Sequence, residues 1–189
     1  DADRPFIVME YVSSSLEQRL ESSPIIPISE AIDLAKQICN ALSHIHGKLI
    51  HRDLKPSNIL VDHDDVPYIT DFGLAKRIPT EADPSEPDTL TGSGAILGTP
   101  SYMAPEQAAG QRGRVEERSD IYSLGAILYA LITSQAPFRA DSPVDTMMQV
   151  LEQDPAPPRL LNPDTDADLE RSRSLPCLLR RERCRRRSR

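Results

Sequence analysis

The chain has 189 residues, which is long enough for one domain with a sizeable core, and its 39% hydrophobic content is typical of a globular protein. The net charge of −7 combines two unlike parts, because residues 171–189 hold nine Arg and one Glu and all other residues together carry −15. Binding to a phosphate backbone needs clustered Lys and Arg on the folded surface. The acidic body therefore argues against nucleic acid as a partner.

The three cysteines (Cys39, Cys177 and Cys184) form no CxxC pair, so neither a zinc site nor a disulfide framework is indicated. A reducing cytoplasm is the simplest setting for such a chain. The longest apolar stretch, residues 121–133, is shorter than the roughly 20 residues that a membrane span requires. We therefore expect a buried core helix there and no membrane segment in this chain.

The first elements expected along the chain are a strand and a short helix. Residues 6–12 (FIVMEYV) form a β-rich run. Ser15 and Gln18 then have the spacing of a capping box, which predicts a helix over residues 16–21. Pro24 and Pro27 end this helix.

A longer amphipathic helix is expected next, with Ser29 as its cap. Its apolar residues recur at intervals of three and four, which predicts a single buried face: Ile32, Ala35, Ile38, Cys39, Leu42 and Ile45. We interpret Cys39 on this face as a small core residue, because nothing nearby in the sequence would lower the pKa of its thiol.

Short strands and tight loops are predicted over residues 49–75, where the polar residues concentrate. The strands are residues 49–50, 59–61 and 66–70, with the loop HRDLKPSN before the second and an acidic turn before the third. Residues 77–97 have little periodicity and read as a mobile loop. The helix at 121–133 follows, and Ser142 and Pro143 then open another helix, with four apolar residues: Val144, Met147, Met148 and Leu151. The fold class predicted is mainly α with small β hairpins (α+β).

Three motifs follow one another in a fixed order. They are HRDLKPSN at residues 51–58, Asp71-Phe72-Gly73, and GTPSYMAPE at residues 98–106, and the run SDIYSLG at 119–125 adds a fourth element. Each is weak evidence alone, but their order and separations resemble the catalytic and metal-binding loops of protein kinases. The KPSN and GTP segments resemble those of the serine/threonine branch of the family. The sequences of the motifs as a whole most resemble those of bacterial Hanks-type kinases.

The chemistry of phosphoryl transfer requires metal ions on the polyphosphate and a group that orients the attacking hydroxyl. Mg²⁺ prefers oxygen ligands, which Asn58 and Asp71 offer from adjacent loops. Asp53 is the candidate base, and Lys55 could place a point charge on the transferred phosphate. The competing interpretation of these residues is that they are hairpin-turn residues with solvated charges.

The resemblance also implies a nucleotide pocket that binds ATP. Met9 would be the gatekeeper, the Glu10 carbonyl and the Val12 amide would face adenine, and Leu60 would form the apolar floor. Taken alone, residues 6–12 favour an ordinary edge strand, and it is their distance ahead of the HRD motif that favours the hinge. Cofactors implied by the family are ATP and Mg²⁺, and the partners implied are protein substrates with Ser or Thr hydroxyls.

Further site residues are carried over from the family pattern. Thr99 would act beside Asp53 and Lys55, and Gly73 would allow the backbone conformation that aims Asp71. His51 is expected to be a structural hydrogen-bonding residue under the loop, not a metal ligand. The residues given structural or regulatory roles are His51, Arg52, Phe72, Gly73, Glu106 and Asp120.

The resemblance divides the chain into three parts. Residues 1–12 would be the hinge and a remnant of an N-terminal lobe, residues 13–170 the C-terminal lobe, and residues 171–189 a basic tail that is disordered or poorly packed. Within the lobe, residues 51–58 form the catalytic loop and residues 71–106 the activation segment. The family's Gly-rich loop, V-A-I-K lysine and partner Glu are not found, so we expect the N-terminal lobe to be missing.

Two functions are compatible with this organisation. The first is ATP-dependent phosphorylation of serine and threonine hydroxyls on proteins, weak or inactive in this chain alone. The second is a noncatalytic docking or scaffold module. The set of Asp53, Lys55, Asn58 and Asp71 favours the first, because a scaffold has no physical need of all four.

Arg52 before Asp53 resembles kinases in which this Arg pairs with a phosphate on the activation segment. Thr89, Thr91 and Ser93 are the candidate phosphorylation sites. We expect mass spectrometry of the purified full-length protein to find phosphate on at least one of them. A segment 71–106 without phosphate would remove the basis of this prediction.

Overall fold

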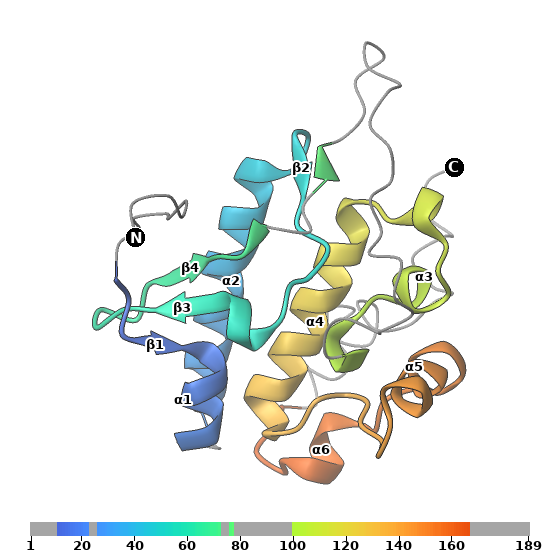
Figure 1. The fold of residues 1–189 in the computed structure, drawn as a ribbon. Helices are drawn as coiled ribbons and strands as arrows, with labels where there is room; N and C mark the ends of the chain where they lie inside the picture. Colours follow the sequence, from blue (N-terminus) through green and yellow to red (C-terminus); the bar gives the residue numbers. More distant parts are fainter. Residues whose placement is uncertain (1–10, 23–25, 73–75, 78–99, 167–189) are drawn as a thin grey trace, which may run out of the picture.

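The computed structural model describes residues 11–22, 26–72, 76–77 and 100–166. Over these residues the chain is mainly helical with two small sheets, as the sequence predicted (Figure 1). The helices are α1 (Leu16–Ser22), α2 (Ile28–Ile45), α3 (Pro105–Ala108), α4 (Glu117–Thr133), α5 (Pro143–Glu152) and α6 (Pro158–Leu161). The strands are β1 (Ser14–Ser15), β2 (Leu49–Ile50), β3 (Ile59–Val61), β4 (Pro67–Ile69) and β5 (Lys76–Arg77). Three 3-10 turns complete the description: η1 (Pro56–Asn58), η3 (Pro100–Tyr102) and η4 (Arg112–Arg114).

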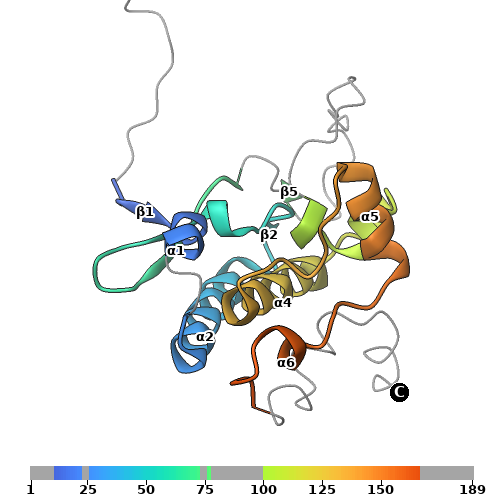
Figure 2. The ribbon, with the colours of Figure 1, turned by 90° about the horizontal axis from the view of Figure 1, so that it is seen from below.

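Helices α2 and α4 lie side by side at the centre of the molecule (Figures 1 and 2). The predicted core helix at residues 121–133 is confirmed, although α4 begins earlier, at Glu117. From Ser119 to its last residue, α4 is buried at every position except the half-buried Ile121. A helix that is apolar on all sides needs neighbours on all sides. Figure 1 shows α1, α2 and the β1-β3-β4 sheet on one side of α4, and α3 and α5 on the other.

The buried face of α2 differs from the one predicted. Its buried residues are Ala31, Leu34, Ala35, Ile38 and Leu42. Cys39 is exposed, so its assignment to the core was wrong. A step of one residue turns about 100° around a helix, so Cys39 faces solvent although the preceding Ile38 is buried in the core.

The predicted cap of α2 was also wrong. The helix begins at Ile28, ahead of Ser29, and Pro27 occupies the cap position without a side-chain hydrogen bond. The Pro27 carbonyl accepts the first helical hydrogen bond, from the Ala31 amide at 3.0 Å. The ring of Pro27 fixes its φ, here −53°, so the chain enters the helix from a rigid residue.

Helix α1 begins as predicted. The Ser15 amide donates to Gln18 Oε1 at 2.9 Å and the Gln18 amide donates to Ser15 Oγ at 3.2 Å, which is a reciprocal capping box. No pattern in the sequence predicted β1, the two residues that directly precede this helix. Ser15 pairs with Leu60 of β3, so the same short segment starts a helix and completes a sheet.

The β3–β4 hairpin is confirmed, and its turn is closed by one carboxylate. Asp62 accepts hydrogen bonds from the amides of Asp64 and Val66, both at 2.9 Å, and from the Tyr68 hydroxyl at 3.1 Å. The hydrogen bond from Val66 is the largest influence on the pKa of Asp62, which lies below its usual value. Arg19 of α1 then binds Asp65 of this turn at 2.5 Å and also Glu30 of α2. One side chain thus links α1, α2 and the hairpin.

Helix α5 has the predicted cap, and only some of its apolar residues are covered. The Ser142 hydroxyl oxygen accepts from the Asp145 amide at 3.1 Å, and Pro143 occupies the first turn. Of the four apolar residues of this helix, Val144 and Met148 are 56% and 45% exposed. The covered side of α5 contributes Met147, Val150 and Leu151 to a second apolar cluster. The other members of this cluster are Met103, Ala108 and Phe138.

Several predictions fall on residues that the structure does not describe: most of the strand at 6–12, the loop at 77–97 beyond Arg77, and the tail at 171–189. Tyr11 and Val12, the described end of the first of these, are not in a strand. Among the helices in the described ranges, none combines the length and the apolar character needed to cross a bilayer.

We predict unequal costs for neighbouring substitutions in α2. Ile38 is 0% exposed, and Ile38→Ala should lower the free energy of unfolding by about 2–5 kcal/mol, because it removes packed methyl groups and leaves a cavity. Cys39→Ala is the matched control and should change it by less than about 0.5 kcal/mol. Urea denaturation measures both. Equal costs would contradict the placement of the α2 face.

Candidate active site

The loop at residues 51–58 joins β2 to β3 and is fixed to the core by its own residues. Leu54 is 2% exposed and belongs to the main cluster. Lys55 has an extended backbone, and Pro56 then begins η1 with its φ already restricted. The Asn58 amide donates to the Lys55 carbonyl at 3.0 Å, which folds the end of the loop back on itself.

This folding brings three predicted site residues together. Lys55 Nζ lies 2.9 Å from Asp53 Oδ2. Asn58 Nδ2 donates to the Asp53 carbonyl at 2.8 Å and to Asp53 Oδ2 at 3.1 Å. A cation and an amide therefore both bind the same oxygen of the Asp53 carboxylate.

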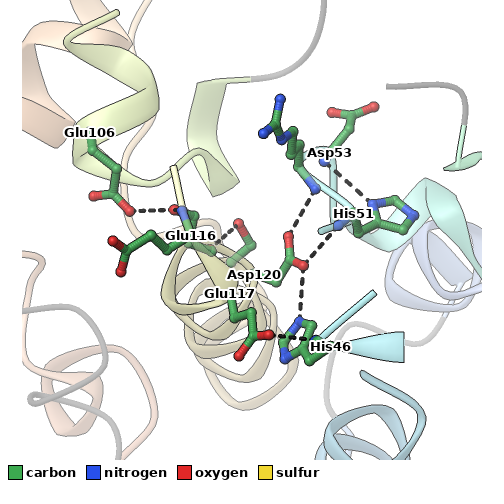
Figure 3. A network of polar contacts seen from close by, with 11 residues as sticks. His46, His51, Asp53, Glu106, Glu116, Glu117 and Asp120 are labelled. Atoms are coloured by element: carbon green, nitrogen blue, oxygen red, sulfur yellow. Dashed lines mark hydrogen bonds and ion pairs between the residues drawn. The ribbon is translucent and has the colours of Figure 1, made fainter. Parts of the chain in front are cut away.

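The carboxylate of Asp120 supports this loop from the first turns of α4 (Figure 3). Asp120 is 1% exposed. It accepts hydrogen bonds from the His51 amide at 2.9 Å, from the Arg52 amide at 2.8 Å and from His46 Nε2 at 3.1 Å. A buried charge is tolerated when donors surround it, and two of these donors belong to the backbone just before Asp53.

His51 is fully buried beneath the loop, and both of its ring nitrogens have partners. Nε2 lies 2.8 Å from the Thr70 carbonyl and must carry the proton, since a carbonyl only accepts. Nδ1 then accepts from the Asp53 amide at 3.3 Å. The Phe72 ring meets the imidazole edge to face, with centroids 4.9 Å apart. This hydrogen-bonded position matches the structural role that the sequence suggested.

Asp71 follows β4, and the backbone just before it is hydrogen-bonded to the end of the loop at residues 51–58. Thr70 donates from its amide to the Asn58 carbonyl at 2.9 Å, and both Thr70 and Phe72 contact His51. Asp71 has a φ of 59° and an exposed side chain. The two segments that carry Asn58 and Asp71 are thus neighbours, while the metal-binding role of each residue stays a prediction.

Residues predicted to bind the nucleotide are only partly described. Leu60 is half-buried in β3, and Val12 is half-buried just before β1. Met9, Glu10, Gly73 and Thr99 lie outside the described residues. Over the described ranges, no group of three or more His, Cys, Asp or Glu residues could hold a metal ion.

Glu106 of α3 faces the start of α4. The Ser119 hydroxyl donates to the Glu106 carboxylate and accepts from the Glu116 amide, the latter at 3.3 Å (Figure 3). Here a serine of α4 joins Glu106 to the helix that also carries Asp120.

A small, open pocket lies beside Asp53. Its lining comes from the loop, η3 and α4: Arg52, Asp53, Leu54, Lys55, Tyr102, Met103 and Ser123. Burial raises the pKa of Tyr102 to about 12, with a further increase from Glu17 and an opposing effect of Arg139. Sequence reasoning assigned no role to Tyr102, because its closeness to Asp53 depends on how η3 packs against α4.

Two more residues were missed. His46 contacts Asp120, and Gln107 of α3 donates from Nε2 to the Arg52 carbonyl at 2.7 Å. Gln107 directly follows the APE motif and could have been noticed there, but its partner is 55 residues away in the chain. No local spacing indicates such a contact.

The described residues form a helix-rich domain with small sheets, in which the loop at residues 51–58 precedes the Asp71-Phe72-Gly73 motif of the sequence. The chain belongs to the protein kinase domain family, whose model matches residues 1–181.

Among its relatives, the serine/threonine-protein kinase PknB of Mycobacterium leprae is 37% identical over 168 residues, and PknB of Mycolicibacterium smegmatis is 39% identical over 169. Each alignment covers 88% of this chain and 26% of the relative. Serine/threonine-protein kinase pkn3 of Myxococcus xanthus is 41% identical over 165 residues, 84% of this chain and 29% of that protein. The chain thus spans about a quarter of the length of the relatives it matches. The resemblance to bacterial Hanks-type kinases is confirmed.

The raised pKa of Tyr102 predicts a loss of stability in strong alkali. An unfolded tyrosine ionises near pH 10, whereas Tyr102 in the folded chain has a pKa of about 12. Its contribution to stability is complete below pH 10 and is lost as the pH rises toward 12, because only the unfolded state then releases the proton.

Absorbance titration of tyrosinate should therefore lose its highest component in Tyr102→Phe. The matched control is Tyr11→Phe, since Tyr11 is 87% exposed, and it should leave the highest component in place. If the titration of Tyr102→Phe kept the highest ionisation and lost a lower one, the assignment of the highest pKa to Tyr102 would be wrong.

Proposed function

We propose that the protein of which these residues form part transfers the γ-phosphoryl group of ATP to serine or threonine hydroxyls of protein substrates. The observation that carries the proposal is the convergence of Lys55 and Asn58 on the carboxylate of Asp53. The relatives' names, which specify serine/threonine-protein kinases, support the class of acceptor.

Asp53 is the residue that would meet the substrate hydroxyl. Its side chain is about a quarter exposed, at 26%, so a hydroxyl can approach it from the adjoining pocket. Asn58 and Lys55 fix its position, and an orienting carboxylate accepts the hydroxyl proton as the new bond forms. Lys55 is 19% exposed and can place its charge on the transferred phosphate.

The donor atoms present fit magnesium. Because Asn58 Nδ2 donates to Asp53, the oxygen of the same amide is directed to the other side. Asp71 supplies an exposed carboxylate from the neighbouring segment. One amide and one carboxylate suit Mg²⁺, which usually takes few protein ligands and completes its shell with phosphate and water. When bound, Mg²⁺ would neutralise charge on the phosphates.

The test is phosphate transfer by the full-length protein. We expect Asp53→Asn to lower the transfer rate by about 10²–10⁴-fold, because the amide cannot accept the proton. Asp64→Asn is the matched control in the exposed hairpin turn, 74% exposed, and should leave the rate unchanged. Equal rates in wild type and Asp53→Asn would exclude the mechanism.

The second candidate is a docking module without catalysis. It is favoured by one observation, which is that these 189 residues contain no Gly-rich loop and no V-A-I-K lysine. For the isolated chain we propose little or no transfer, because the phosphates lack the loop that would cover them. Transfer by the isolated chain that survives purification and disappears in Asp53→Asn would contradict this.

A further inference from the structure

The backbone of Arg52 has an uncommon conformation. Its φ is 70°, in the left-handed region that residues with a Cβ rarely adopt. Such a conformation persists where the surrounding structure holds it in place. Arg52 directly precedes Asp53, so the backbone conformation of Arg52 sets the direction in which the chain enters Asp53.

Both polar groups of the Arg52 main chain are held by side chains from elsewhere. The Arg52 amide donates to Asp120 Oδ1 at 2.8 Å. The Arg52 carbonyl accepts from Gln107 Nε2 at 2.7 Å. The two partners come from α4 and α3, and together they fix the peptide groups before and after the Arg52 Cα.

The side-chain amide of Gln107 is itself oriented. Its Oε1 accepts from the Ala104 amide at 3.2 Å. An amide flip would place an acceptor against the Arg52 carbonyl and a donor against the Ala104 amide, so both hydrogen bonds require the same orientation. Ala104 and Ala108, on either side of Gln107, are 0% and 7% exposed. Gln107 therefore lies in a helical turn whose neighbouring residues are buried.

We propose that Gln107 is a positioning residue, through which the segment after the APE motif holds the left-handed conformation of Arg52 and hence the placement of Asp53. Gln107 contacts none of the residues assigned to ATP or magnesium, and it acts through the Arg52 carbonyl. The kinetic consequence rests on the proposed function, whereas the structural consequence does not.

Two variants separate this role from a simple helix cap. Gln107→Glu keeps an oxygen for the Ala104 amide but loses the donor to the Arg52 carbonyl. Gln107→Leu loses both. If Gln107 positions the loop, both variants of the full-length protein should lower kcat by about 10–100-fold with an unchanged KM for ATP, since small misplacements of reacting groups are costly. If Gln107 only caps α3, the Glu variant keeps the wild-type kcat, which would overturn the proposal.

A second measurement does not depend on activity. Hydrogen exchange at the Arg52 and Asp53 amides of the full-length protein should become about ten times faster in both variants, because a hydrogen bond that holds the loop is lost. Gln111→Leu is the matched control, since Gln111 is exposed in the same segment, and it should leave exchange and kcat unchanged. Unchanged exchange in Gln107→Glu would overturn the proposal, even if the wild-type protein transfers no phosphate. Faster exchange with an inactive wild type would support it and count only against the proposed function.

Discussion

The arrangement of the site depends on the buried carboxylate of Asp120. It lies in the first turns of α4, where the helix dipole favours a negative charge, and it binds two successive backbone amides, of His51 and Arg52. Helix α4 is fixed in turn by apolar packing against α2. The hydrophobic core therefore determines where the loop before Asp53 runs, and the chemistry at the surface follows from packing in the interior.

Local features of the fold were predictable because they depend on residues close in sequence. The capping box at Ser15 and the cap at Ser142 each join atoms three residues apart. The positions of Cys39, Val144 and Met148 were not predictable, since an apolar spacing defines a stripe but not which edge of it meets a neighbour. Only the packing of α2 against α4, and of α5 against α3, decides which residues are covered.

The same distinction applies to the site. Asp53, Lys55 and Asn58 lie within six residues, so their spacing sufficed to group them, and the structure brings them together. Asp71 depends on a short hairpin, which the sequence also showed. Tyr102 and Gln107 come close to the loop through contacts between residues far apart in the sequence, and no motif indicates which residues they contact.

Met103 belongs both to the pocket beside Asp53 and to the apolar cluster beneath α5. Close-packed interiors transmit changes in volume to their neighbours. A substitution at Phe138 or Val150, which share this cluster with Met103, would consequently reshape the wall of the pocket without changing any residue of the loop. Buried packing residues thus affect the surface beside Asp53 although they do not contact it.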